Sequence, residues 1–280
     1  RLKTAAALLA HDDVIVVSSI SCIYGMGNPQ DWREMSQQLA INQTIDKLKL
    51  TQNLVTLQYE RNDIDLQPGR FRIKGNTIDI MLSYDQALYR IIIDQHKIER
   101  ITKHDPITQK LIHKTDSIYI FPAKQYVVPA ERMQAAYQSI KQELATHAPT
   151  LGALEQERLI QRTKYDLEMM QEMGYCNGIE NYSAHFEGRA LDTPPSCLLD
   201  FFPKDFLLII DESHQSIPQA GAMYHGDLAR KKNLVEHGFR LPSAFSNRPL
   251  KFNEFETYFN QVIFVSATPG PYELQHATNH

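Results

Sequence analysis

The sequence predicts an α/β protein in which a parallel sheet domain is interrupted by a small antiparallel β domain and a helical segment. Apolar runs without polar alternation, typical of strands buried on both faces of a parallel sheet, occupy residues 14–17, 206–210 and 261–265. Residues 69–80 instead alternate apolar and polar side chains, which predicts half-buried antiparallel strands. Two long amphipathic stretches predict helices over 130–147 and 153–173.

The composition bounds the classes of protein to which the chain can belong. Its 280 residues leave room for two domains, and 42% hydrophobic and 22% charged residues are typical of a globular protein. The apolar runs are far shorter than the about 20 residues of a membrane-spanning helix, so we expect no membrane contact and a cytoplasmic location. The net charge of −4 means that any nucleic-acid binding needs a local basic surface.

The cysteines and the start of the chain add two expectations. Cys22, Cys176 and Cys197 are widely separated and show neither metal-ligand spacing nor a disulfide framework, which fits a reducing cytosol. The chain begins at Arg1, in what reads as the middle of a helix, without an initiator methionine. We therefore expect an interior piece of a longer protein.

Residues 32–122 are predicted to form the inserted β domain. A helical pattern covers about 32–50, and short strands follow from about residue 52, with a turn at Gly75-Asn76. Period two places Arg72 and Lys74 on one face of their strand, and Arg61 and Arg90 could join them in one exposed basic face. A solvated charged face and a docking face for an acidic partner both explain this pattern.

A helical segment with polar loops is predicted for residues 123–205. Pro129 suits the first turn of the helix over 130–147, and Gly174 suits the end of the helix over 153–173. Further on, basic residues gather between 226 and 251, with Phe239 among them: Arg230, Lys231, Lys232, Arg240, Arg248 and Lys251. Such a stretch can follow phosphates while its aromatic side chains contact bases, but a solvated helix face explains it equally well.

The most informative stretch is Phe206–His214, in which an apolar strand runs directly into Asp-Glu-Ser-His. Ligands of parallel sheets bind beyond the carboxyl ends of the strands. There Asp211 can hold Mg²⁺, while Glu212 acts as a base or positions a water. The alternative is that the acidic pair only begins a surface loop. Two other predicted strands also end in hydroxyl side chains, at 18–21 and 266–268, and this convergence favours a functional site.

Several stretches resemble the UvrB family, the helicase-like, damage-verifying proteins of bacterial nucleotide excision repair. The Asp-Glu-Ser-His strand and the later Ser-Ala-Thr strand are similar to motifs of superfamily 2 helicases. The stretches most similar to the family are SCIYGMGNP (21–29), QRTKYDLEMM (161–170), GIENYS (178–183), HGFRLPSA (237–244), NRPL (247–250) and SATPGPYEL (266–274). The resemblance runs over almost the whole chain.

The resemblance implies a partial RecA-like domain of the P-loop NTPase type, made of residues 1–31 and 206–280. It implies ATP and Mg²⁺ as cofactors, with Asp211 as the Mg²⁺ ligand, Glu212 acting on the attacking water, and His214, Ser266 and Thr268 coupling the nucleotide to DNA. It also implies UvrA, UvrC and damaged double-stranded DNA as partners. The residues implied to contact UvrA are Arg61, Arg72, Lys74 and Arg90. Those implied to face DNA are Ser21, Tyr24, Arg162, Glu180, Tyr182, Phe239 and Arg240.

The sequence also departs from the family. No GxxxxGK followed by Ser or Thr occurs in the 280 residues, so we expect this chain by itself neither to bind nucleotide tightly nor to hydrolyse it. Ile92 stands where the family tends to have a glutamate, two residues after Arg90. The alternative function for this polypeptide is therefore a non-catalytic protein- or DNA-binding module. The alternative family is the transcription–repair coupling factor, which shares the β domain.

Overall fold

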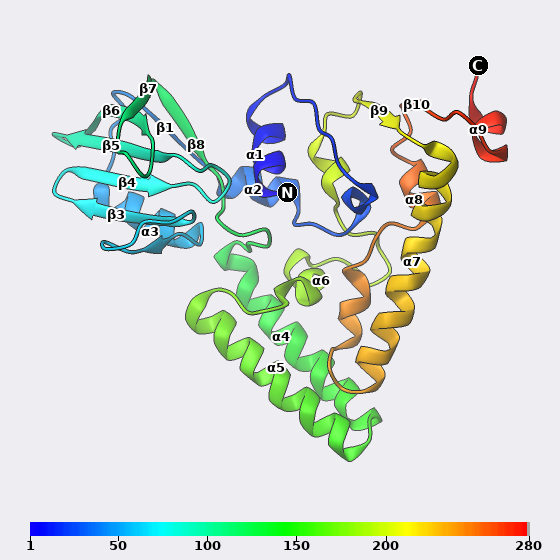
Figure 1. Ribbon diagram of the computed structural model, residues 1–280. Helices are drawn as coiled ribbons and strands as arrows, with labels where there is room; N and C mark the ends of the chain where they lie inside the picture. Colours follow the sequence, from blue (N-terminus) through cyan, green and yellow to red (C-terminus); the bar gives the residue numbers. More distant parts are fainter. Residues whose placement is uncertain (279–280) are drawn as a thin grey trace. The chain divides into compact units, whose positions relative to one another are not determined.

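The structure, a computed structural model, describes residues 1–278 and contains two compact units (Figure 1). Unit 1 consists of Arg1–Ile15 and Pro29–Val127, and unit 2 consists of Val16–Asn28 together with the chain from Val128 onward. The segment 1–31 is therefore divided between the units, with residues 1–15 joined to the β domain. Each unit has a hydrophobic core of its own.

Unit 1 is built on a six-stranded sheet in the order β2-β3-β4-β5-β6-β7. Its strands are β2 (Glu60–Arg61), β3 (Arg70–Lys74), β4 (Thr77–Met81), β5 (Leu88–Asp94), β6 (Lys97–His104) and β7 (Leu111–Thr115). β2 runs parallel to β3, and the other neighbours are antiparallel. The predicted turn at Gly75-Asn76 joins β3 to β4, and Gly75 takes up a φ of 57° there, which glycine adopts without steric cost.

One face of this sheet carries the core of unit 1. Phe71, Ile78 and Ile91, on three neighbouring strands, are completely buried. Helix α3 (Lys47–Thr56) contributes Leu50 and Leu54 to the same core cluster. The alternate residues of these strands point to the opposite face, as the period-two pattern predicts. We call it the open face: Lys74, Arg100 and Lys114 are exposed on it, while Asp79 and Leu88 are buried.

The prediction of a single helix over 32–50 is wrong for the middle of this stretch. The stretch holds the end of α2 (Pro29–Met35), then β1 (Gln37–Ala40), then the start of α3, while α1 (Leu2–Ala10) opens the unit. β1 pairs antiparallel with β8 (Ser117–Ile120) and carries Leu39 into the core. The partner strand is remote in the sequence, so local periodicity could not reveal this pairing.

The apolar run 14–17 does not form the predicted strand. The run has no regular secondary structure, and Ile15 and Val17 are 94% and 97% exposed. β-branched residues favour a strand only where a neighbour satisfies their backbone hydrogen bonds and covers their side chains. The described residues place no such strand beside this run.

Unit 2 contains the two predicted long helices, α4 (Ala130–His147) and α5 (Ala153–Met173), with the bounds that were predicted. Gly174 ends α5 at a left-handed φ of 66°, and its N–H donates to the carbonyl of Met170. The other α-helices are α6 (Ser183–Glu187), α7 (Ser213–Glu236), α8 (Phe252–Glu256) and α9 (Pro271–His276). The 3-10 turns are η1 (Ile20–Ile23), η2 (Ala148–Thr150), η3 (Ile179–Tyr182), η4 (Leu198–Phe201) and η5 (Pro242–Ser246). Within residues 1–278, no helix has the length and apolar character that crossing a membrane requires.

Unit 2 also contains the predicted parallel pair, β9 (Leu207–Ile210) and β10 (Gln261–Phe264). On one side of the pair, Ile210 packs with Ile217 of α7 and Phe255 of α8 in the core of this unit. On the other side, Leu207 and Ile209 are 53% and 57% exposed. The expectation of strands buried on both faces is therefore wrong, because the described residues cover only one face of this two-stranded sheet.

Candidate functional site

Asp211 and Glu212 lie at the carboxyl end of β9, beside the carboxyl end of β10, and both are exposed. Glu212 precedes α7 with a left-handed φ of 45°. A non-glycine residue in this region costs about 1 kcal/mol or more, and such outliers cluster at functional sites. The Glu212 N–H donates to Asp211 Oδ1 over 3.0 Å, so the other carboxylate oxygen of Asp211 keeps its capacity to accept.

Two side chains connect this acidic end with the end of β10. His214 Nδ1 lies 2.8 Å from Ser266 Oγ and 3.4 Å from Glu212 Oε2. Ser266 Oγ also accepts the backbone N–H of Thr268 over 3.1 Å. The structure thus brings together the residues that the sequence predicted from two strands about 50 positions apart in the chain.

The donor atoms at this site fit a hard cation, but only as part of a ligand set. Mg²⁺ prefers oxygen ligands, and Asp211 and Glu212 offer exposed carboxylates. Within residues 1–278, no three His, Cys, Asp or Glu side chains are grouped so that they could hold a metal ion. A cation here would take most of its ligands from phosphate oxygens and waters, as Mg²⁺ does in nucleotide sites.

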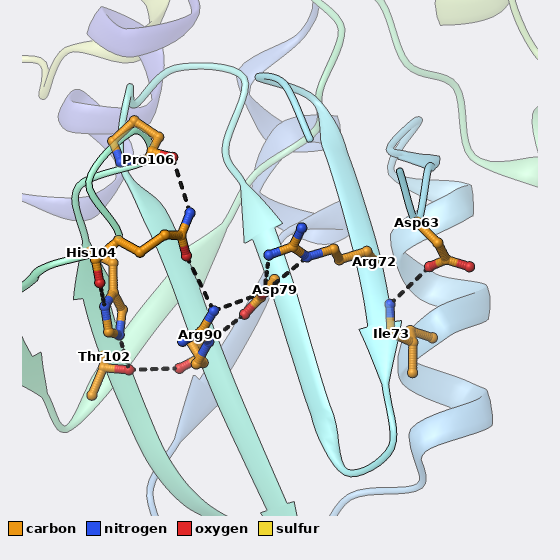
Figure 2. A network of polar contacts seen from close by, with 9 residues as sticks. Asp63, Arg72, Ile73, Asp79, Arg90, Thr102, His104 and Pro106 are labelled. Carbon is orange, nitrogen blue, oxygen red and sulfur yellow. Dashed lines mark hydrogen bonds and ion pairs between the residues drawn. The ribbon is translucent and has the colours of Figure 1, made fainter. Parts of the chain in front are cut away.

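A second candidate site lies on the open face of the six-stranded sheet (Figure 2). Asp79 on β4 lies between its register partners, Arg72 on β3 and Arg90 on β5. Arg72 donates to Asp79 Oδ2 from Nε (3.0 Å) and Nη2 (2.8 Å), and Arg90 donates to Oδ1 from Nε (2.7 Å). We call these three residues the arginine–aspartate cluster.

The cluster is charged although it is largely shielded from water. The Asp79 side chain is 5% exposed, against 17% for Arg72 and 30% for Arg90. Burial alone would raise the pKa of Asp79, but the hydrogen bonds from Arg90 and Arg72 outweigh it and hold that pKa below its ordinary value. The bond to Asp79 in turn raises the pKa of Arg90. One carboxylate and two guanidiniums leave a net positive charge at neutral pH.

A hydrogen-bond network extends the cluster toward the β6–β7 hairpin (Figure 2). Arg90 Nη2 donates to Gln109 Oε1 over 3.4 Å, and Gln109 Nε2 donates to the carbonyl of Pro106 over 3.0 Å. His104 lies between the Gln109 carbonyl (3.1 Å) and the Thr102 hydroxyl (3.0 Å), and Thr102 donates to the Arg90 carbonyl. Arg90 is therefore held from both sides of its strand.

The predicted basic face needs two corrections. Arg61 lies on β2, where its register partner is the buried Phe71, and it pairs with Asp63 at 3.0 Å. Arg61 therefore does not lie on the same face of the sheet as Arg72. Arg72 itself is mostly buried against Asp79, so the expectation of four freely exposed cations is wrong. Lys74 is exposed and has no ion pair with any residue that the structure describes.

Tyr24 and Lys231, both predicted on nucleic-acid surfaces, belong to a polar network inside unit 2. The Tyr24 hydroxyl donates to Asp227, which pairs with Lys231 Nζ at 2.8 Å. Lys231 is 4% exposed, and burial lowers its pKa against the opposing effect of Asp227. Arg248 is likewise buried and pairs with Glu254 at 2.6 Å. The basic stretch 226–251 is therefore not one continuous surface.

Arg162 and Tyr182 share one carboxylate. Arg162 Nε lies 3.1 Å from both oxygens of Asp166, and the Tyr182 hydroxyl donates to Asp166 Oδ2 over 2.8 Å. Burial and the nearby Asp166 raise the pKa of Tyr182, so its hydroxyl stays protonated. Tyr182 is 5% exposed, which contradicts the expectation that its ring faces a ligand. Arg162 keeps 41% of its side chain exposed.

The other residues predicted to face DNA are at least partly accessible. Glu180 and Arg240 are half-buried, and neither forms an ion pair within residues 1–278. Phe239 is 46% exposed, and the guanidinium of Arg158 lies 4.4 Å from its ring centroid. Ser21 is half-buried, with its Oγ 2.7 Å from that of Ser19. Sequence reasoning did not single out Arg158.

Asp79 is the other residue that sequence reasoning missed, although its signal was present. A two-residue turn at Gly75-Asn76 fixes the register of the hairpin. Lys74 then faces Thr77, and Arg72 faces Asp79. Directly opposed residues of opposite charge form the cross-strand pairs that stabilise antiparallel sheets.

Comparison with known proteins assigns the chain to a family. Residues 38–126 match the UvrB interaction domain, and residues 131–188 match the UvrB third helical domain. The chain is 51% identical over 277 residues to the UvrABC system protein B of Methanosarcina acetivorans. It belongs to the UvrB family. The corresponding proteins of Geobacillus kaustophilus and Microcystis aeruginosa are 49% identical over 282 residues and 48% identical over 283 residues.

The chain spans about two fifths of the length of the curated relatives that it matches. The alignments cover 99%, 99% and 100% of this chain, but 41%, 43% and 42% of the proteins from M. acetivorans, G. kaustophilus and M. aeruginosa. The matched interaction domain contains the arginine–aspartate cluster, and the matched helical domain contains Arg162 and Glu180.

Proposed function

We propose that the chain acts in nucleotide excision repair and docks a UvrA-type subunit through the open face of its six-stranded sheet. Two findings support this: the relatives are named as component B of a UvrABC system, and residues 38–126 match an interaction domain. The observation that carries the docking surface is the arginine–aspartate cluster, in which one buried carboxylate holds two partly exposed guanidiniums.

The geometry of the cluster suits recognition of carboxylates. Asp79 engages Nε and Nη2 of both arginines, so Nη1 of Arg72 and Nη1 of Arg90 remain as donors. Guanidinium groups form the stronger, charge-assisted hydrogen bonds with carboxylates. Because Asp79 already fixes both side chains, a partner would order little of them on binding, and affinity benefits from this pre-organisation.

A second proposed role, within a protein of the relatives' length, is ATP hydrolysis at the end of β9. Asp211 would hold the Mg²⁺ of MgATP, whose phosphates supply the remaining anionic ligands. Glu212 would deprotonate or position the attacking water. His214 and Ser266 hold the acidic turn against the end of β10. This role requires a phosphate-binding loop that the 280 residues do not contain.

A third part of the proposal concerns DNA, the nuclease partner and the compartment. Arg162, Arg240 and the exposed Phe239 would face damaged double-stranded DNA, because cations and an aromatic ring suit phosphates and bases. Within a protein of the relatives' length, Glu180 would pair with a further segment, since it has no ion pair among the described residues. The assembled complex would then recruit a UvrC-type nuclease in the cytoplasm.

The docking role is tested by titrating the chain with the UvrA-type subunit of the same organism. Lys74 is the suitable position, because it is exposed and its reversal leaves the arginine–aspartate cluster intact. Lys74→Glu should weaken binding by about 1 kcal/mol or more, since a cation becomes a repelling anion. Lys49→Glu, on the exposed side of α3, is the matched control and should bind as the unaltered chain does. Equal affinities for both variants would contradict the docking role.

The rival function, a purely non-catalytic binding module, rests on the missing phosphate-binding loop. Measured ATP hydrolysis separates the two. Under the rival the 280-residue chain by itself shows no turnover, whereas under our proposal a protein of the relatives' full length hydrolyses ATP. Docking to the UvrA-type subunit is common to both, so the titration and the hydrolysis assay test different parts of the proposal.

A further inference from the structure

We infer that the docking face extends across the sheet to Arg100 on β6 and Lys114 on β7, and that it takes an acidic protein surface. The inference deepens the proposed docking function and rests on it. Neither residue belongs to the four positions that the resemblance implies, and both lie two or more strands away from Arg72.

The strand register places these residues in two cross-strand rows. One row runs Arg72, Asp79, Arg90, Thr102, Lys114 from β3 to β7. The neighbouring row runs Lys74, Thr77, Ile92, Arg100 from β3 to β6. Directly opposed residues in a sheet point to the same side. Both rows therefore lie on the open face, opposite the core that contains Phe71, Ile78 and Ile91.

The charge of the two rows is opposite to that of the chain. Together they hold five cations and one carboxylate, a net of +4, whereas the whole chain carries −4. No cation directly faces another cation within the two rows, and Asp79 is the one carboxylate that they offer to five cations. Asp79 offsets one of the two positive charges of Arg72 and Arg90, so the arginine–aspartate cluster keeps a net charge of +1. The remaining cations are best explained by a partner that supplies the missing negative charge.

Arg100 and Lys114 are available to such a partner. Both are exposed, and Lys114 forms no ion pair within the described residues. Arg100 forms an ion pair with its sequence neighbour Glu99, at 3.2 Å, and both side chains are about half exposed. Exposed pairs of this kind contribute about 0–1 kcal/mol and are readily exchanged for a better partner.

The composition of the face favours a protein over a nucleic acid. The half-buried Ile92 lies between Thr77 and Arg100 in one of the rows. The rows contain no aromatic ring on which a base could stack. Apolar patches among arginines are typical of protein interfaces. Carboxylates of an acidic protein surface are therefore the ligands that this face fits.

The test uses the full chain and titrates the UvrA-type subunit with Arg100→Glu, Lys114→Glu and their double variant. The double variant should bind about tenfold more weakly at low salt. Its melting temperature should equal that of Lys49→Glu, the control on the covered side of the sheet. A parallel titration uses duplex DNA, for which the same variants should show no change.

Each other outcome is decisive. If Lys74→Glu weakens binding but the double variant does not, the extension to β6 and β7 is overturned and the proposed docking function stands. If the unaltered chain does not bind the UvrA-type subunit, or if Lys74→Glu has no effect on that binding, the docking function fails and the inference fails with it. Loss of DNA binding with unchanged protein binding would overturn the acidic-protein partner.

Discussion

The imidazole of His214 and the hydroxyl of Ser266 lie 2.8 Å apart and join the turn after the acidic pair to the end of the neighbouring strand. A backbone bond from Ser213 N–H to the Val265 carbonyl runs between the same two segments. A group bound at Asp211 and Glu212 would therefore act on the end of β10 through these two hydrogen bonds. The bond between the His214 and Ser266 side chains can be removed by a single substitution.

Ser266→Ala should lower the free energy of unfolding by about 1 kcal/mol, because His214 and the Thr268 N–H both lose their partner. Ser18→Ala is the control, since Ser18 Oγ is exposed and donates to the carbonyl of the next residue. Urea denaturation of both variants measures the difference. Equal free energies of unfolding for the two variants would mean that water replaces the hydrogen bonds of Ser266 in solution.

Glu212→Gln should abolish ATP hydrolysis in a protein that carries this chain within the relatives' full length. Glutamine keeps the shape but cannot accept the proton of the attacking water, which costs about 10²-fold or more in turnover. The 280-residue chain itself should show no turnover. Glu236→Gln, an exposed glutamate at the end of α7, is the control. Turnover by the 280-residue chain that Glu212→Gln removes would show that the phosphate site has been misplaced.

Asp79→Asn should destabilise unit 1 by about 2–4 kcal/mol at pH 7, because two partly buried guanidiniums lose their counter-charge. The pKa of Asp79 is lowered in the folded state. Its stabilisation is therefore complete above the unfolded value of about 3.9 and is lost as the pH falls through the lower folded pKa. The difference between the unaltered chain and the variant should shrink on acidification below about pH 4.

Unfolding in urea at a series of pH values measures this difference. Asp94→Asn, an exposed aspartate at the end of β5, is the matched control and should show almost no difference at any pH. A difference for Asp79→Asn that stays constant with pH would mean that the shape of the side chain matters and not its charge.

Gly238→Ala should destabilise unit 2 much more than Gly188→Ala, although both glycines have a left-handed φ, of 68° and 63°. An added Cβ at Gly238 would lie 2.1 Å from the carbonyl oxygen of Glu155, whereas nothing lies within 4 Å at Gly188. Gly188→Ala therefore carries only the backbone cost of about 1–2 kcal/mol, and Gly238→Ala adds a steric clash worth at least about 1–3 kcal/mol. Thermal melts compare them, and equal losses would contradict the close approach of Gly238, just after α7, to the backbone of Glu155 in α5.

The elements that the sequence predicted well are those whose signals are local. Pro129 and Gly174 mark the ends of the long helices, and Gly75-Asn76 marks the hairpin, because each residue acts on its own backbone. The strand at 37–40 and the absence of one at 14–17 depend on remote partners. No periodicity within a short window carries that information.

The sites divide in the same way. The acidic turn and Ser266 were predictable because strand ends of a parallel pair meet at one edge. The burial of Tyr182 and Lys231 was not, because each contacts a partner 16 residues away in the sequence, Asp166 for Tyr182 and the Asn247 carbonyl for Lys231. Sequence patterns mark a residue as polar, but only tertiary contacts decide whether its partner is a ligand or a neighbouring side chain.

The pairing of Arg72 with Asp79 also changes how docking must be tested. Reversal of Arg72 to Glu would place two carboxylates together at a mostly buried position, so Arg72→Glu should lower stability as well as binding. An exposed arginine at this position would have left stability unchanged. Lys74, Arg100 and Lys114 are the positions at which charge can be reversed without disturbing the cluster.

The most direct test of an acidic partner on this face is the salt dependence of affinity for the UvrA-type subunit. We expect the unaltered chain to bind at least about tenfold more weakly at about 0.5 M salt than at about 0.05 M, because added ions screen exposed charges. The triple variant Lys74→Glu, Arg100→Glu, Lys114→Glu should bind weakly at low salt and approach the unaltered chain at high salt. An affinity of the unaltered chain that does not change with salt, or one that the triple variant matches at both concentrations, would contradict docking through this charged face.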